Sequence, residues 1–401
     1  MARFQRPPLA TDGAALPREQ QLSLFERLGN AAKAIETEDP APLAQRLFLI
    51  VLALLGLGLV MQVNHAATTQ PAEEFWALFS SQMFFRIAAL VALVLGFRLG
   101  PQGLRQYIPA LTVLTFVALL LVFVPGFAAS RNGAHRWIEL PFVGVSFQPS
   151  ELARIVMILW VADRCIRLGP DVLDMRRGLL PMLAVGFLFF FTILIETDLG
   201  GSLLFMVCFV STLWMGGADF AKMAGPVAGI GGTAVLLVVT CVGYIRHRML
   251  MWFGSATNHQ VERSADAIAS GDFFGVGLGQ GLYRNARVPY LDTDYVFALV
   301  GEELGLFGML VLLGLFLAFT WTALRLVLSI KDRYAALCAF GLLLSVCVQA
   351  MVHMQVVTRL APPKGMPLPF ISHGGTALVV SSLAVGLALG AARSKPDGLP
   401  R

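Results

Sequence analysis

The chain has 401 residues, of which 57% are hydrophobic and only 14% are charged. Soluble domains carry charge on about a quarter of their residues, so this composition excludes a soluble globular protein. The 29 phenylalanines and a mean hydropathy of +0.72 also exclude disordered, collagen-like and disulfide-stapled chains. The net charge of +5 does not indicate nucleic acid as a partner, because the cations are spread between apolar runs. A polytopic membrane protein remains.

Residues 1–45 are charged and contain prolines, and they lack the apolar core and cleavage site of a signal peptide. We expect a mobile cytoplasmic tail there. It is either simply solvated or in contact with cytoplasmic proteins. A second short tail is expected at 393–401.

Ten apolar stretches are candidates for crossing about 30 Å of hydrocarbon. Nine are clear, near 46–64, 83–98, 107–126, 179–195, 199–217, 226–245, 304–324, 335–357 and 376–392. The tenth, near 150–166, has charged residues on either side of its apolar run, so its length alone also allows a re-entrant segment. The sequence predicts an all-α, polytopic membrane domain of ten transmembrane helices at 46–392, with a large extracytoplasmic loop at 246–293 between helices seven and eight.

Basic residues in short loops favour the cytoplasmic side of a membrane. With ten spans and both termini inside, most basic residues between spans fall in cytoplasmic loops: Arg98, Arg105, Arg164, Arg167, Arg176, Arg177, Lys222, Lys331 and Arg333. Omitting the span near 150–166 would move a four-arginine loop outside, so that span is retained. The outer segments 127–149 and 246–293 contain arginines against this bias, which makes their charges candidates for function.

The first outer motif is Asn-Gly-Ala-His-Arg-Trp at 132–137, followed by Phe-Gln-Pro-Ser-Glu-Leu-Ala-Arg at 147–154. Ser150 is a plausible helix N-cap, and Glu151 and Arg154 then share one face of the first turn. Ordinary capping with Trp137 as an interfacial residue is one interpretation. The other is that Arg136 and Arg154 bind an anionic headgroup.

Three further outer segments carry charge or glycine. A tight turn at 196–201 contains Asp198, and a glycine-rich run occupies 275–281. A nucleotide loop is excluded at 275–281, because neither a strand nor a Gly-Lys-Ser/Thr sequence accompanies the glycines. Four carboxylates lie between Asp292 and Glu303 at the mouth of a span, where ionisable groups usually mark a site.

The segment before the last span, 362–375, has four prolines and a glycine pair that exclude a regular helix. Irregular backbone at membrane depth is tolerated where protein or a wet cavity shelters it. Lys364 in this segment either extends to the interface or holds a phosphate.

Together these motifs resemble the SEDS (shape, elongation, division and sporulation) family, which includes FtsW and RodA, over about residues 46–392. The similar segments are 132–137, 148–151, 198–200, 274–279, 293–294, 301–305 and 367–375. Lys364-Gly365 is more similar to the FtsW branch. Several positions depart from the family pattern: Asp292 replaces the usual His, His373 replaces Tyr, and Glu196-Thr197 replaces Gln-Pro. Smaller or uncharged residues are also expected where the chain has His353, Gln355 and Arg359.

The resemblance implies a ten-helix peptidoglycan glycosyltransferase of the cytoplasmic (inner) membrane. Such an enzyme polymerises lipid II with a class B penicillin-binding protein and other division or elongation proteins. It also implies a divalent cation, Mg²⁺ or Mn²⁺, for which Glu151, Asp198 and Asp294 are candidate ligands. The family's essential aspartate falls on Asp294, which we expect to be the general base.

Nearby Asp292 is expected to raise the proton affinity of that base by like-charge repulsion. The expected substrate-binding residues are Arg136, Trp137, Glu151, Arg154, Asp198, Asp292, Lys364 and Ser372. Two alternatives stay open, a lipid II flippase and a non-catalytic scaffold for division proteins. A flippase would need ionisable groups along a path through the bilayer, whereas a scaffold would need only a partner surface.

Overall fold

A computed structural model describes residues 39–69, 72–126, 128–131, 134–140, 145–254, 259–285 and 293–394. Most of the predicted N-terminal tail and of the C-terminal tail therefore lies outside the described residues. The first described helix begins at Pro40, within the segment expected to be tail.

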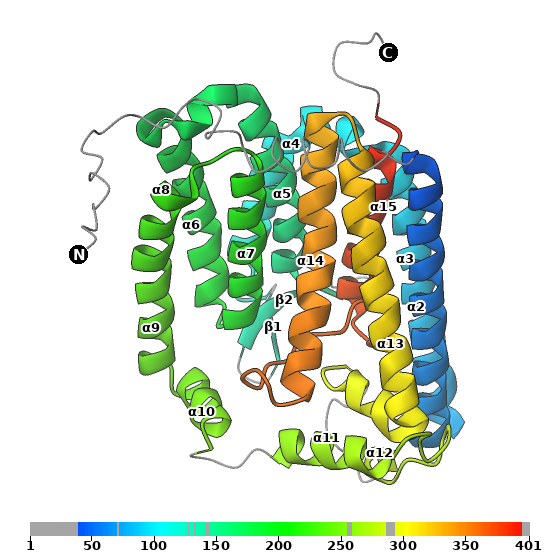
Figure 1. Ribbon diagram of the computed structural model, residues 1–401. Coiled ribbons are helices and arrows are strands. Elements are labelled where there is room, and N and C mark those ends of the chain that lie inside the picture. The colour runs from blue at the N-terminus through cyan, green and yellow to red at the C-terminus, as the bar shows by residue number, and fades with distance from the viewer. Residues whose placement is uncertain are drawn as a thin grey trace, which may run out of the picture.

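Within these residues each of the ten predicted spans coincides with a helix, or with two helices in series (Figure 1). The spans are α2 (Pro40–Thr69), α3 (Ala72–Leu104), α4 (Ile108–Leu121), α5 (Pro149–Leu168), α6 (Leu180–Ile195), α7 (Leu199–Met215), α8 (Phe220–Pro226) with α9 (Gly232–Cys241), α13 (Val296–Ser329), α14 (Arg333–Val357) and α15 (Gly375–Ala391). A π-helical turn at Val227–Gly231 joins α8 to α9.

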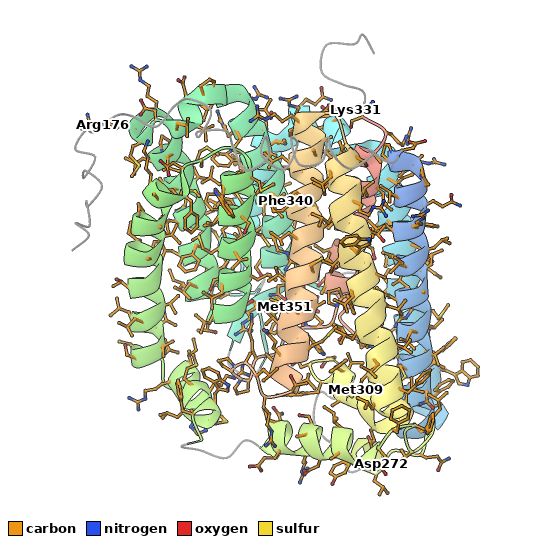
Figure 2. The ribbon with its side chains drawn as sticks, in the orientation of Figure 1. Arg176, Asp272, Met309, Lys331, Phe340 and Met351 are labelled. Carbon is orange, nitrogen blue, oxygen red and sulfur yellow. The ribbon has the colours of Figure 1, made fainter. Side chains whose placement is uncertain are left out.

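Three shorter helices, α10 (Gly243–Trp252), α11 (His259–Ser270) and α12 (Leu282–Asn285), lie together at one end of the bundle (Figure 1). They fall within or beside the predicted 246–293 loop. The start of α2 and the end of α15 lie at the opposite end, as an even number of spans requires. Figure 2 shows Arg176 and Lys331 at that opposite end and Asp272 beside α11, with Phe340 in the band between. These labelled charged side chains therefore lie at the two ends of the bundle, outside its apolar middle.

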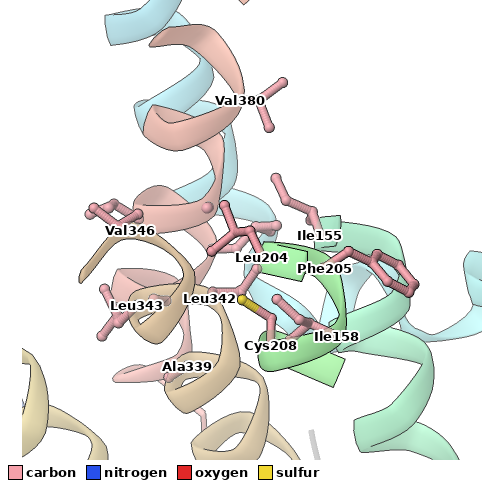
Figure 3. Packing of buried hydrophobic residues seen from close by; sticks show 14 of the residues in the cluster. Ile155, Ile158, Leu204, Phe205, Cys208, Ala339, Leu342, Leu343, Val346 and Val380 are labelled. Atoms are coloured by element: carbon pink, nitrogen blue, oxygen red, sulfur yellow. The ribbon is translucent and has the colours of Figure 1, made fainter. Parts of the chain in front are cut away.

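Helix α5 was the ambiguous span, and the structure makes it a full helix of 20 residues. Its central residues from Ile155 to Ala162 are all buried in the protein. Figure 3 shows Ile155 and Ile158 of α5 packed with Phe205 and Cys208 of α7 and with residues of α14 and α15. Because α5 is surrounded by other helices, it does not need the long uninterrupted apolar stretch of a lipid-facing span.

A small sheet connects α4 to α5 and was not predicted. Strands β1 (Ala128–Arg131), β2 (Ala134–Leu140) and β3 (Val145–Phe147) pair antiparallel in the order β1-β2-β3. The Asn-Gly pair at 132–133 is a hairpin signal in the sequence that predicts such a pairing. Strand β2 carries Arg136 and Trp137.

The glycine-rich loop and the Glu302-Glu303 pair are parts of one structural unit. Helix α13 is kinked at Gly305, which has a φ of 65° that favours glycine. The loop wraps this kink, with the amides of Val276 and Gly277 donating to the carbonyl oxygens of Glu302 and Glu303. Both glutamates are fully buried here.

Their side chains accept hydrogen bonds from protein groups. Glu302 accepts from the Tyr283 amide at 2.8 Å, and Glu303 accepts from the Asn64 side chain at 2.6 Å. The two carboxylates expected to mark a site at the mouth of this span therefore anchor the loop to α13 and α2, because burial without such partners would be costly.

Candidate active site

A cavity of about 1360 Å³ opens among segments that are far apart in the sequence. It is lined by residues of α3, β2, β3, α5, α7, α10, α11, α15 and the segments 293–295 and 363–374. Seven of the predicted site residues line it: Arg136, Trp137, Glu151, Arg154, Asp198, Asp294 and Lys364. The structure thus brings together residues from five separate motifs.

Asp294 lies just before α13 and is partly exposed to the cavity. Its carboxylate packs against the backbone of Gly365, where an added Cβ would lie 2.5 Å from Oδ2. Real Cβ atoms do not approach this closely, so glycine at 365 is required for the observed position of Asp294. This is a close approach of one predicted motif to another.

Arg136 and Asp198 form one charged pair in the cavity. Arg136 Nη1 lies 3.7 Å from Asp198 Oδ1, and Nη2 donates to the Thr197 carbonyl oxygen. Asp198 caps α7 by accepting from the Gly201 amide at 2.8 Å, and its Oδ2 accepts from Gln148 at 3.2 Å. The carboxylate therefore orients the arginine and starts the helix at the same time.

Glu151 and Arg154 form the second pair, with Arg154 Nη2 donating to Glu151 Oε2 at 2.8 Å across the first turn of α5. The N-cap of α5 is Gln148 and the helix begins at Pro149, so Ser150, which was expected to be the N-cap, lies inside the first turn. Nε of Arg154 and Nε of Arg136 have no hydrogen-bond partner among the described residues. Each guanidinium thus retains a donor that is not used within the described part of the chain.

Lys364 lies close enough to both pairs to interact with their charges. Its side chain lies directly over Gly200 in the first turn of α7, so that any side chain at 200 would occupy the same space. Nζ contacts Met366 Sδ at 2.9 Å. Three basic groups therefore face two carboxylates on this wall, and α7 presents its N-terminus beside them, so the wall favours an anion.

The electrostatics of the wall follow from burial and from these charges. Burial lowers the pKa of Lys364 to about 8, against the opposing attraction of Asp198. Burial acts to raise the pKa of Asp198, but Arg136, Lys364 and the amides of Gly201 and Gly200 together hold it below its ordinary value. Lys364 is thus mostly charged at neutral pH and Asp198 is ionised.

Glu196 differs from its neighbours. It is 1% exposed, and neither carboxyl oxygen has a hydrogen-bond partner among the described residues. Burial, with a smaller contribution from repulsion by Asp198, raises the pKa of Glu196 to about 9. It is therefore a neutral acid near pH 7, similar in shape to an amide.

Ser372 does not line the cavity, although it was predicted to bind substrate. It is 2% exposed, donates to the Thr293 carbonyl oxygen at 2.6 Å and accepts from the Leu368 amide at 2.8 Å. Because Thr293 precedes Asp294, this hydroxyl fixes the 362–375 segment to the chain that carries the aspartate. Its role in the structure is to position other residues.

Other buried polar side chains hold the same segment, and sequence reasoning missed their roles. His353 Nδ1 lies 2.7 Å from the Met366 carbonyl oxygen and Gln349 donates to the Pro367 carbonyl oxygen at 3.0 Å, both from α14. Arg86 of α3 donates to the Phe370 carbonyl oxygen at 3.4 Å. A polar residue inside an apolar run was the available signal. The irregular backbone is sheltered by protein, as expected.

The expected cation ligands do not form a metal site in the described part of the chain. No three His, Cys, Asp or Glu side chains gather there as a ligand set. Glu151 is bound by Arg154, and Asp198 by Arg136, Gln148 and Gly201. A cation bound at either carboxylate would share it with these protein partners. Asp292 lies outside the described residues.

The described residues form ten helical spans around a charged cavity at one end, which defines a polytopic helical membrane protein with a candidate anion-binding site. Residues 45–396 match the model of the FtsW/RodA/SpoVE family, described as "Cell cycle protein". The chain belongs to this family.

Individual relatives are similar to the chain over most of its length. It is 31% identical over 362 residues, covering 89% of this chain and 95% of the relative, to a "Probable peptidoglycan glycosyltransferase FtsW" of Geobacter metallireducens. It is 30% identical over 355 residues, covering 86% and 96%, to "Stage V sporulation protein E" of Bacillus subtilis.

Two solved structures share the fold. One is described as "Structural coordination of polymerization and crosslinking by a peptidoglycan synthase complex" (TM-score 0.70, 24% identity, 86% of this chain and 96% of that one). The other is the rod shape determining protein RodA of Thermus thermophilus (TM-score 0.64, 23% identity, 86% and 95%).

Proposed function

We propose that this chain is a peptidoglycan glycosyltransferase that polymerises lipid II at the outer face of the cytoplasmic membrane. The observation that carries the proposal is the convergence of Asp294 with Arg136, Arg154 and Lys364 on one cavity. A carboxylate beside a cationic wall suits a reaction that removes a proton from a hydroxyl and releases an anion. The names of the relatives support the same activity.

In the proposed reaction the 4-hydroxyl of one lipid II attacks the anomeric carbon of the sugar that carries the other polyprenyl pyrophosphate. The new C–O bond forms as the bond to pyrophosphate breaks, and the bonding electrons leave with the pyrophosphate. Asp294 accepts the hydroxyl proton. Gly365 leaves the space that this carboxylate occupies, and Ser372 fixes the carbonyl oxygen of Thr293, the preceding residue.

The leaving pyrophosphate gains negative charge as its bond breaks, so cations on the wall favour the transition state more than the ground state. Arg136, Arg154 and Lys364 supply that charge. Glu151 and Asp198, which also line the cavity, orient the two arginines through the pairs described above. Trp137 lines the same wall, where its ring is suited to packing against a sugar.

The divalent cation expected from the resemblance remains a prediction. Polymerisation by metal-depleted protein, with Mg²⁺ or Mn²⁺ added back, measures that dependence. A class B penicillin-binding protein remains the proposed partner, supported by the similar fold in a complex described as coordinating polymerization and crosslinking. We also propose that the end carrying α10 to α12 faces outward and that both termini face the cytoplasm.

Asp294→Asn in purified protein tests the assignment. Removal of a general base typically costs about 10²- to 10⁴-fold in rate, so we expect at least about a hundredfold slower glycan synthesis from lipid II. Asp272→Asn is the matched control, because Asp272 is an exposed aspartate on the same end that does not line the cavity. Unchanged synthesis by Asp294→Asn, with normal membrane insertion, contradicts the assignment.

The same assay separates the alternatives. A flippase or a scaffold makes no glycan strands, with or without the penicillin-binding partner. Glycan formation that occurs in the wild-type chain and in Asp272→Asn but is lost in Asp294→Asn supports the enzyme.

A further inference from the structure

Helix α10 places a basic side chain on the cavity wall. Arg248 and Met251, three residues apart on one face of α10, both line the cavity. Arg246, two residues earlier, is exposed and does not line it. The extended backbone of Val242 (ψ 105°) separates α10 from the spanning helix α9 and lets α10 take its own direction. One face of α10 thus belongs to the cavity.

Large apolar residues are exposed at the C-terminal end of α10. Leu250 and Trp252 of the helix and Phe253, its C-cap, are 42%, 41% and 71% exposed. Exposed tryptophan and phenylalanine at one end of a helical bundle are typical of the membrane interface. We therefore expect α10, and Arg248 with it, near the depth of the lipid headgroups, where the pyrophosphate of a polyprenyl-linked sugar also lies.

Arg248 comes from a different element of the chain than the other cations of the cavity. Arg136, Arg154 and Lys364 come from β2, α5 and the segment before α15, and they lie near Asp198 and Glu151. Arg248 comes from α10 and lines the same cavity. The cavity therefore receives a further cation from an element outside the cluster around Lys364.

The proposed reaction needs cations for two anionic groups. Both substrates are lipid-linked pyrophosphates, and only one of the two bonds to pyrophosphate is broken, so two dianionic groups occupy the cavity at once. Repulsion between them is costly in a partly buried site unless each meets its own cations. The cluster around Lys364 stabilises the leaving pyrophosphate, which leaves the second one to be bound elsewhere.

We propose that Arg248 binds the pyrophosphate of the acceptor substrate, the one that keeps its lipid link, in the cavity that Gln260 of α11 also lines. This inference rests on the proposed function and adds a second anion subsite to it. A guanidinium suits this role because it binds phosphate oxygens in pairs.

Counting bound pyrophosphates tests the proposal. Undecaprenyl pyrophosphate is titrated into detergent-solubilised Asp294→Asn protein, and native mass spectrometry counts the bound molecules. With Arg246→Gln, a matched arginine on the same helix, we expect two. With Arg248→Gln we expect one at the same concentration, the second binding on the order of tenfold more weakly, and Arg248→Lys should recover part of that loss.

The steady-state rate gives an independent measurement in the protein that retains Asp294. Arg248→Gln should raise the lipid II concentration needed for half-maximal synthesis about tenfold, while Arg246→Gln leaves it unchanged. Equal counts and equal concentration dependence in the two variants, with similar thermal stability, overturn the subsite.

Different results would overturn the proposed enzyme activity and the proposed pyrophosphate subsite. If Asp294→Asn abolishes synthesis but Arg248→Gln binds two pyrophosphates, the enzyme stands and the subsite falls. If Asp294→Asn still makes glycan strands, the base assignment falls whatever the binding counts show.

Discussion

Glu196→Gln should make the stability of the protein less dependent on pH. Glu196 is 1% exposed, its pKa is raised to about 9, and its ordinary value is 4.5. At pH 7 the unfolded chain carries this group ionised, whereas the folded chain carries it protonated. Folding therefore takes up a proton, which at 1.36 kcal/mol per pKa unit costs about 3 kcal/mol at pH 7.

The sign follows from the raised pKa. The stabilisation that the neutral carboxyl provides is fully present below pH 4.5, declines as the pH rises, and is lost as the pH passes about 9. Glutamine is neutral at every pH and has nearly the same shape. The difference in stability, Glu196→Gln minus wild type, should therefore grow from pH 5 to pH 9 by several kcal/mol and then level off.

Thermal unfolding in detergent at pH 5, 6, 7, 8 and 9 measures this difference. The unsatisfied amide of the glutamine shifts the whole curve but not its slope, so the slope is the quantity to compare. Glu139→Gln, which removes a carboxyl from an exposed position on β2, is the matched control. Parallel curves for wild type and Glu196→Gln would refute a buried, protonated Glu196.

Two further predictions concern the cavity. Gly365→Ala should slow glycan synthesis at least about tenfold with little loss of stability, because the new Cβ would lie 2.5 Å from Asp294 Oδ2 and must displace it; Gly229→Ala, where nothing lies within 4 Å, is the control, and equal rates would show that Asp294 tolerates displacement. The affinity of Asp294→Asn protein for undecaprenyl pyrophosphate should fall above pH 8, because the pKa of Lys364 is about 8 and its charge is lost as the pH rises. Lys364→Arg, which stays charged, should show a shallower fall, and identical pH profiles would contradict this role of Lys364.

Much of the fold could be predicted because hydropathy acts within a segment. Each apolar run must satisfy its own backbone as a helix in the bilayer, whatever its neighbours are. The ten spans near their predicted positions follow from this rule. The small sheet at 128–147 was missed because its strands are short and their pairing depends on contacts between them.

The site could be predicted only in part. Seven predicted residues meet in the cavity because irregular, charged segments on one side of the membrane have few other places to lie. Ser372 lies outside the cavity, and Glu302 and Glu303 hold the glycine-rich loop, although similar motifs and local charge indicated direct roles. A hydroxyl or carboxylate has the same sequence signature whether it faces a ligand or a backbone amide.

The sequence by itself determined the class of protein, the number of spans and the distribution of basic residues between the two ends, because these depend on composition and local hydropathy. Tertiary structure alone decided that Lys364 lies over Gly200, that Gly365 packs against Asp294 and that Arg248 lines the same cavity. Such contacts join residues far apart in the chain, and their geometry is set by helix packing, which no local pattern records.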